Sequence, residues 1–153
     1  MRIALYQPDI PQNTGTILRM AACLGVGVDL IGPAGFDASD RALRRAGLDY
    51  LAHVDLTRHD SFDSFWAERV RVGRLRLLLA TTRGEVRHDE FGFLVNDILM
   101  LGRESAGVPE AIHHAVAARI RVPMREGLRS LNVAVSAAII TGEALRQTGG
   151  LPA

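Results

Sequence analysis

Short apolar runs alternate along this chain with segments in which apolar residues recur every three or four positions. The apolar runs predict strands at residues 2–6, 28–31, 76–80, 98–101 and 118–122, with a weaker strand near 52–56. The helical spacing predicts helices at residues 14–25, 38–46, 60–68, 108–116 and 131–147. Because strands and helices alternate, the pattern predicts an α/β fold with an open, mostly parallel sheet and helices on both faces.

Two predicted strands in the last third of the chain each lead into a loop rich in glycine, arginine and hydroxyl residues. The first loop lies within Leu101–Pro109, and the second runs from Ile120 to Asn132. In open parallel sheets, ligands bind where strand-to-helix loops meet at the carboxyl ends of the strands, so we expect one composite ligand site here. The loop at Asn13 follows the first predicted strand and is expected at the same edge, although Asn13 or Thr14 is also a candidate helix cap.

The glycines of the first loop suit a close approach of the backbone to a ligand. We interpret Glu104, between Gly102 and Gly107, as a hydrogen-bond acceptor that orients the loop. A valine at Gly102 is expected to obstruct the ligand while leaving the fold intact. The spacing from Gly102 to Ser105 is one residue longer than in the nucleophile elbow of hydrolases, which disfavours a hydrolase.

The composition narrows the function classes. The 153 residues suit a single domain spanning residues 1–153, and the net charge of +1 argues against a general polyanion binder. All 18 basic residues are arginines, which excludes a lysine Schiff base or a P-loop lysine and allows bidentate contacts with phosphate. The glycine patterns of dinucleotide-binding and P-loop proteins do not occur in the sequence.

Several sequence features favour a cytoplasmic protein that binds neither a membrane nor a metal. Cys23 is the single cysteine, so an internal disulfide is impossible and a reducing compartment fits. The start of the chain is typical of a strand rather than a secretion signal. The longest apolar stretch, Val133–Ile140, is far shorter than the ~20 residues that span a bilayer. His113 and His114 are adjacent and point to different sides of a helix, and no residue spacing suits a metal site.

The predicted C-terminal helix, residues 131–147, carries apolar residues on nearly every side. A helix of this kind is buried on more than one side. In so short a chain, the side of this helix that faces away from the sheet is covered either by another helix of the same molecule or by a second copy of the protein. We favour the second copy, which makes the protein a homodimer.

Three ordered segments of the chain resemble the SPOUT superfamily of RNA methyltransferases, specifically its ribose 2′-O-methyltransferase branch. The first segment holds Asn13 and Arg19, and the second is the loop that begins at Leu101. The third runs from Ile120 through Ser130-Leu131-Asn132. Within this branch, the start of the chain and the stretches IGPAGF and RRAGLDY are most similar to single-domain enzymes that methylate the wobble cytidine or uridine of tRNA.

The resemblance implies methyl transfer from S-adenosylmethionine to a ribose 2′-hydroxyl. It also implies a C-terminal trefoil knot whose loops bind the cofactor, a feature that general folding rules disfavour. The residues expected to hold the cofactor lie at the strand ends and in the loops that follow, namely Ala80, Gly102, Val122, Ser130 and Leu131.

The same resemblance places Arg19 at the reacting ribose, as a catalytic residue. Because the guanidinium of arginine stays protonated, Arg19 is a poor general base. Orienting a phosphate or offsetting negative charge on the ribose oxygen requires no loss of its proton. The residues expected to contact the tRNA are one asparagine and two arginine pairs, namely Asn13, Arg41, Arg44, Arg125 and Arg129. Two alternatives stay open: the same chemistry on ribosomal RNA, and a non-catalytic module that binds a nucleotide or phosphate.

Overall fold

The computed structural model describes residues 1–45 and 49–153, which form a layer of parallel strands between two layers of helices. The described strands make one seven-stranded sheet in the order β3-β2-β1-β6-β4-β7-β5. Their bounds are β1 Arg2–Tyr6, β2 Gly27–Ile31, β3 Leu56–His59, β4 Leu77–Ala80, β5 Val86–Arg87, β6 Ile98–Leu101 and β7 Ala118–Arg121. The α/β fold predicted from the sequence is confirmed.

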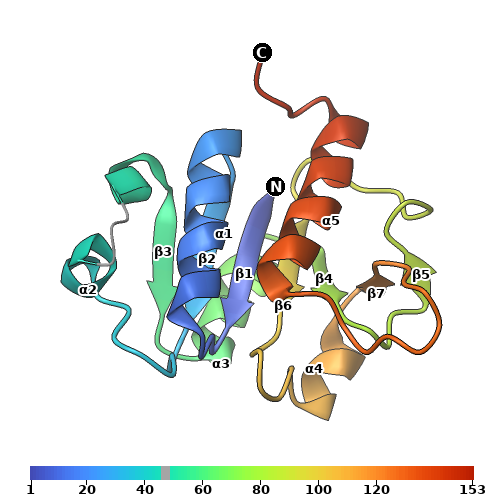
Figure 1. Ribbon diagram of the computed structural model, residues 1–153, viewed down its shortest axis with the longest axis horizontal. Helices are drawn as coiled ribbons and strands as arrows, with labels where there is room; N and C mark the ends of the chain where they lie inside the picture. Colours follow the sequence, from blue (N-terminus) through green and yellow to red (C-terminus); the bar gives the residue numbers. More distant parts are fainter. Residues whose placement is uncertain (46–48) are drawn as a thin grey trace.

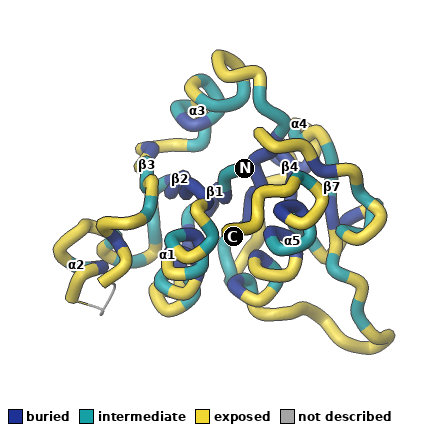
Figure 2. The backbone as a smooth tube through the Cα atoms, turned by 90° about the horizontal axis from the view of Figure 1, so that it is seen from above, coloured by how far each residue is buried: buried dark blue, intermediate teal, exposed yellow. Residues whose placement is uncertain are grey.

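Helices cover both faces of this sheet. α1 and α5 lie side by side across one face (Figure 1), whereas α3 and α4 lie on the opposite side of the strands (Figure 2). The helical bounds are α1 Pro11–Leu24, α2 Asp40–Arg45, a 3-10 turn η1 Asp49–His53, α3 Phe62–Phe65, a π-helical segment η2 Trp66–Val72, α4 Glu110–Ala115 and α5 Val133–Thr148.

The alternation of side chains along β1 shows how the core is divided. Ile3 and Leu5 pack in the cluster that contains residues of α1 and α5. Ala4 and Tyr6 point to the other face and pack with residues of α3 and α4. Successive side chains of a strand face opposite sides, so both faces of this central strand are buried.

Two expected elements differ clearly from the structure. The weak strand expected near 52–56 is misplaced, because 49–53 forms the turn η1 and the strand β3 begins only at Leu56. β3 was obscured by polar side chains such as His59, whose ring is buried against Asp29. α1 begins at Pro11, which suits the first helical position because proline lacks an N–H group. The capping expectation for Asn13 or Thr14 is therefore wrong, since both lie inside α1.

The remaining differences are smaller. The helix expected at 60–68 is present as α3, which is capped by Ser61. It continues into η2 and therefore ends later than expected, at Val72. The two-residue strand β5 had no sequence signal of its own. The helix expected at 38–46 appears as α2, and its last position, together with part of the RRAGLDY stretch, lies outside the described residues.

Candidate functional site

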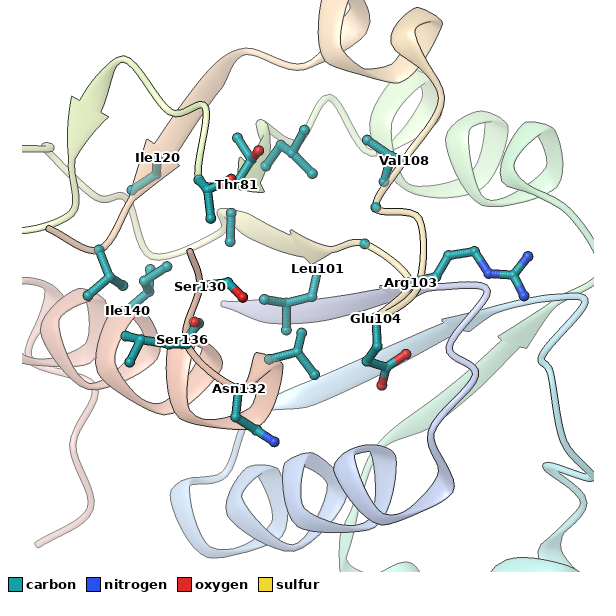
Figure 3. Close-up of a pocket in the computed structure, with 18 of the residues that line it drawn as sticks. Thr81, Leu101, Arg103, Glu104, Val108, Ile120, Ser130, Asn132, Ser136 and Ile140 are labelled. Atoms are coloured by element: carbon teal, nitrogen blue, oxygen red, sulfur yellow. The ribbon is translucent and has the colours of Figure 1, made fainter. Parts of the chain in front are cut away.

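A cavity of about 400 Å³ lies at the carboxyl ends of β4, β6 and β7. β4 lies between β6 and β7 in the sheet. The loop after β6 and the loop after β7 therefore leave from either side of β4 and form a crevice over its end. Both loops anticipated from the sequence line this cavity, and Figure 3 shows their side chains converging on it. The expectation that the two loops meet at this edge of the sheet is confirmed.

The five residues expected to hold a cofactor all line the cavity: Ala80, Gly102, Val122, Ser130 and Leu131. Leu101 and Ile140 add further apolar wall, and the hydroxyl-bearing residues Thr81 and Ser136 add polar groups. An apolar cavity with a few polar groups is the usual form of a small-molecule site.

The loop after β6 is closed by its own backbone. The Arg103 N–H donates to the Gly107 carbonyl at 3.0 Å, and the Gly107 N–H donates to the Arg103 carbonyl at 2.8 Å. Gly107 has a φ of +65°, a left-handed conformation that favours glycine. The Arg103 side chain leaves this loop and points away from the cavity (Figure 3).

Gly102 lies directly against this closed loop. A Cβ atom at Gly102 would lie 2.7 Å from the carbonyl carbon of Gly107, a distance that forces backbone to move. The expectation that a valine here would spare the structure is therefore wrong. Gly102 is required for packing within the loop, and a side chain there disturbs the cavity wall itself.

Hydrogen bonds join the three segments that carry the sequence motifs. Glu104 accepts from the backbone N–H of Asp9 at 3.0 Å and from Nδ2 of Asn13 at 3.3 Å. Asn132 donates from its own Nδ2 to Oδ1 of Asn13 at 2.9 Å. Asn13 thus bridges the loop after β6 and the start of α5. The interpretation of Glu104 as an acceptor that orients the loop is confirmed.

Asn132 also caps α5. Its Oδ1 accepts from the backbone N–H groups of Ala134 at 2.8 Å and Val135 at 3.4 Å. These are N–H groups that the first turn of a helix leaves without partners. One side chain therefore fixes both where α5 begins and where α5 stands relative to α1.

Asp9 ties the loop after β1 to the same network. It accepts from the backbone N–H of Glu104 at 3.2 Å and from the Ser105 hydroxyl, and it pairs with Arg103 at 3.5 Å. Hydrogen bonding with Glu104, and then with Ser105, lowers the pKa of Asp9 to about 2. Asp9 is therefore ionised near neutral pH and holds the two loops together as an acceptor.

Arg19 is not brought to the cavity of its own chain. It lies on the exposed side of α1, with its guanidinium carbon 4.8 Å from the centre of the Tyr50 ring in η1. That distance is typical of a cation–π contact. Asn13, six residues earlier on the same helix, does line the cavity.

The arginines divide into paired and exposed groups. Arg69 and Arg76, which cluster with others in the sequence, bind the buried carboxylates Asp29 and Asp97. The four arginines expected at the RNA are exposed, lie outside the cavity lining and form no ion pair with a described carboxylate: Arg41, Arg44, Arg125 and Arg129.

Some residues of the site gave no sequence signal of their own. His113 lines the cavity from α4, whereas the sequence indicated only that His113 and His114 point to different sides of a helix. Asp9 was missed because a lone carboxylate after a strand is common. Within residues 1–45 and 49–153, no cluster of three His, Cys, Asp or Glu residues is arranged to hold a metal ion. The helices described there are all too short or too polar to cross a membrane.

The chain as a whole is similar to known proteins of one family. The model of the SpoU rRNA Methylase family matches residues 1–142. A Beijerinckia indica protein named tRNA (cytidine(34)-2′-O)-methyltransferase is 57% identical over 149 residues, covering 97% of this chain and 92% of the relative. An Escherichia coli K12 protein with the same name is 40% identical over 152 residues, covering 97% and 94%.

Solved structures give the same picture. One described as structural insights into the 2-OH methylation of C/U34 on tRNA has a TM-score of 0.88 and 43% identity, covering 95% of this chain and 94% of that chain. The SpoU methyltransferase AviRb from Streptomyces viridochromogenes, solved with AdoMet, has a TM-score of 0.83 and 27% identity, covering 96% and 60%.

Proposed function

This chain belongs to the SpoU rRNA Methylase family, and we propose that it transfers the methyl group of S-adenosylmethionine to the ribose 2′-hydroxyl of the wobble nucleotide of tRNA, cytidine or uridine 34. The family and the named relatives support the reaction class. The structural observation that carries the proposal is the meeting of three motif-bearing segments around one cavity, joined through Asn13, Glu104 and Asn132.

The cavity fits the cofactor in size and chemistry. Its volume of about 400 Å³ falls within the range of roughly 300–1,000 Å³ usual for ligand pockets. Leu101, Val122 and Leu131 offer apolar surface to an adenine, and the strand-end backbone at Ala80 and Gly102 lies beside them. When bound, S-adenosylmethionine supplies an electrophilic methyl group, so the protein needs mainly to orient the two reactants.

Arg19 acts, in this proposal, on the charge that develops at the ribose oxygen or on a neighbouring phosphate. A protonated guanidinium stabilises negative charge, whereas it is a poor acceptor for the hydroxyl proton. Arg19 does not line the cavity of its own chain, and we propose that the Arg19 of a second copy acts there. The catalytic proposal is therefore tied to a homodimer.

A homodimer is supported by the exposed face of α5. Val135, Ala138 and Ile139 of α5 are exposed, and so is Leu131 just before the helix, next to the cavity. The rest of the chain therefore covers only part of the helix. A stable dimer buries on the order of 800 Å² per partner.

Replacing Val135 with aspartate is expected to convert the dimer to a monomer, because it places a charge in the proposed interface. The measurement is light scattering at micromolar concentration. Val72→Asp is the matched control, since Val72 is 75% exposed on the distant segment η2 and should leave the mass unchanged. A parent protein that is monomeric under these conditions would contradict the proposal.

The tRNA contacts are proposed to come from the exposed arginine pairs on α2 and in the loop after β7. Removing one phosphate contact lowers the slope of log affinity against log salt by roughly one. Arg129→Ala, and Arg44→Ala with Arg45→Ala, are expected to flatten this slope without changing cofactor affinity. Arg146→Ala is the control, because Arg146 is paired with Glu143 at 2.8 Å. If every variant has the same salt dependence of tRNA affinity as the parent, these arginines do not contact the tRNA and are ordinary solvent-exposed residues.

Three further properties complete the proposal: one domain over residues 1–153, which the chain length suggests, a cytoplasmic location, which the single cysteine suggests, and the C-terminal trefoil knot that the resemblance implies. The knot is supported by the way two loops, one starting at Thr81 and the other at Val122, enclose the same cavity. Tracing the chain in a crystal structure tests whether residues 122–132 pass through the loop between β4 and β6.

One assay distinguishes the proposed function from the two alternatives, methylation of ribosomal RNA and binding without catalysis. Purified protein is incubated with S-adenosylmethionine and either unmodified tRNA or ribosomal RNA, and 2′-O-methyl nucleosides are located by mass spectrometry. The proposal expects the methyl group at the wobble position of tRNA alone. A ribosomal RNA enzyme would methylate the second substrate, and a non-catalytic binding module would methylate neither.

A further inference from the structure

His113 is a cavity residue that the proposed reaction has not used. It projects from α4 and lines the cavity, and only 8% of its surface is exposed. Its Nδ1 atom is shielded from solvent and has no hydrogen-bond partner in the described part of the chain. A buried polar atom without a partner destabilises a fold, so a group in the cavity that supplies the missing hydrogen bond would relieve this cost.

The surroundings of His113 favour its neutral form. Burial first, and then the positive charge of Arg83, lower the pKa of His113, while Glu110 raises it and His114 lowers it further. Arg83 is itself paired with Glu110 at 2.9 Å, which joins the loop after β4 to α4 beside the histidine. Near neutral pH the ring is therefore an uncharged hydrogen-bonding group.

The position of α4 indicates which part of the ligand meets His113. Ile112, the preceding residue, packs in the same core cluster as Leu79 of β4, and Leu79 lines the cavity together with His113. The next residue of β4 is Ala80, where the strand-end backbone is proposed to hold the nucleoside. An uncharged imidazole suits a hydroxyl or a base nitrogen, whereas the carboxylate and ammonium groups of the methionine half call for charged partners.

We propose that His113 hydrogen-bonds an uncharged polar group of the nucleoside half of S-adenosylmethionine and positions the cofactor in the cavity. This inference rests on the proposed function, because it names a contact within the same site. It adds a residue of α4 to a site whose other proposed cofactor residues lie at strand ends and in the loops that follow them.

The test is isothermal titration calorimetry with two probes, S-adenosylhomocysteine and 5′-methylthioadenosine. The second probe has the nucleoside but lacks the amino-acid part. His113→Leu is expected to weaken both probes about tenfold, equivalent to ~1.4 kcal/mol. His113→Asn places a polar atom near the position of Nδ1 and should recover most of the affinity. His114→Leu is the control, since the neighbouring side chain is 73% exposed, and it should bind like the parent.

The outcomes separate this inference from the function on which it rests. A parent protein that binds neither probe would overturn the proposed function. A parent that binds S-adenosylhomocysteine, together with unchanged affinity in His113→Leu, would overturn the role of His113 alone. Weakening of S-adenosylhomocysteine without weakening of the shorter probe would move the contact to the methionine half and contradict the assignment. If His113→Leu does not melt cooperatively, His113→Phe replaces it, because phenylalanine keeps the ring without its nitrogens.

Discussion

Replacing Arg19 with alanine is expected to slow methyl transfer about a hundredfold, a loss of ~3 kcal/mol of transition-state stabilisation. If Arg19 stabilises charge that develops only during the reaction, kcat and kcat/KM should fall by similar factors. Single-turnover methylation on saturating tRNA measures the effect. The affinity for S-adenosylhomocysteine should hardly change, because Arg19 does not line the cavity of its own chain.

Two further variants separate catalysis from local structure. Arg19→Lys keeps a positive charge beside Tyr50 but cannot reproduce the bidentate contacts of a guanidinium, so it should stay slow. Tyr50→Leu removes only the cation–π partner and should keep most of the rate. A near-parental rate for Arg19→Ala would reduce Arg19 to a surface residue of α1. The dimer variant Val135→Asp should share the defect of Arg19→Ala, since the proposed role needs the second copy.

Replacing Gly102 with alanine is expected to weaken cofactor binding at least tenfold, equivalent to ~1.4 kcal/mol. The added Cβ would lie 2.7 Å from the backbone of Gly107, so the closed loop that forms one wall of the cavity has to move. Overpacking of this kind also lowers the free energy of unfolding by roughly 1–3 kcal/mol. Titration with S-adenosylhomocysteine and thermal melting measure the two effects.

Gly92→Ala is the matched control for Gly102→Ala. A Cβ atom at Gly92 would meet no other atom within 4 Å, so the same chemical change should leave both affinity and melting temperature near the parental values. Unchanged affinity for Gly102→Ala would show that the loop after β6 is not part of the cofactor site.

The elements that the sequence predicts well are those with a strong local pattern. The buried strands β4 and β6 are uninterrupted apolar runs, and so is β1 after its first residue, Arg2. The ends of these strands mark the edge of the sheet where the cavity lies. β3 was misplaced because its polar residues have their partners elsewhere: the ring of His59 meets the buried carboxylate of Asp29, and only the folded sheet brings them together.

The site itself was predicted in part, for a similar reason. Glycines and hydroxyl residues after strands signal a ligand loop, and the residues of these loops do line the cavity. The bridge from Glu104 through Asn13 to Asn132 joins residues up to 119 positions apart, and no local pattern reveals such a contact. His113 was missed because helical periodicity does not tell whether a histidine meets solvent, core or cavity.

The most direct test of the central claim is a map of 2′-O-methyl groups in RNA from cells that lack this gene. The account predicts that the methyl group at the wobble position of one or more tRNAs disappears and that ribosomal RNA is unchanged. Expression of the parent protein should restore the modification, whereas Arg19→Ala should restore it poorly. Loss of a ribosomal RNA methyl group instead, or an unchanged map of tRNA, would contradict the account.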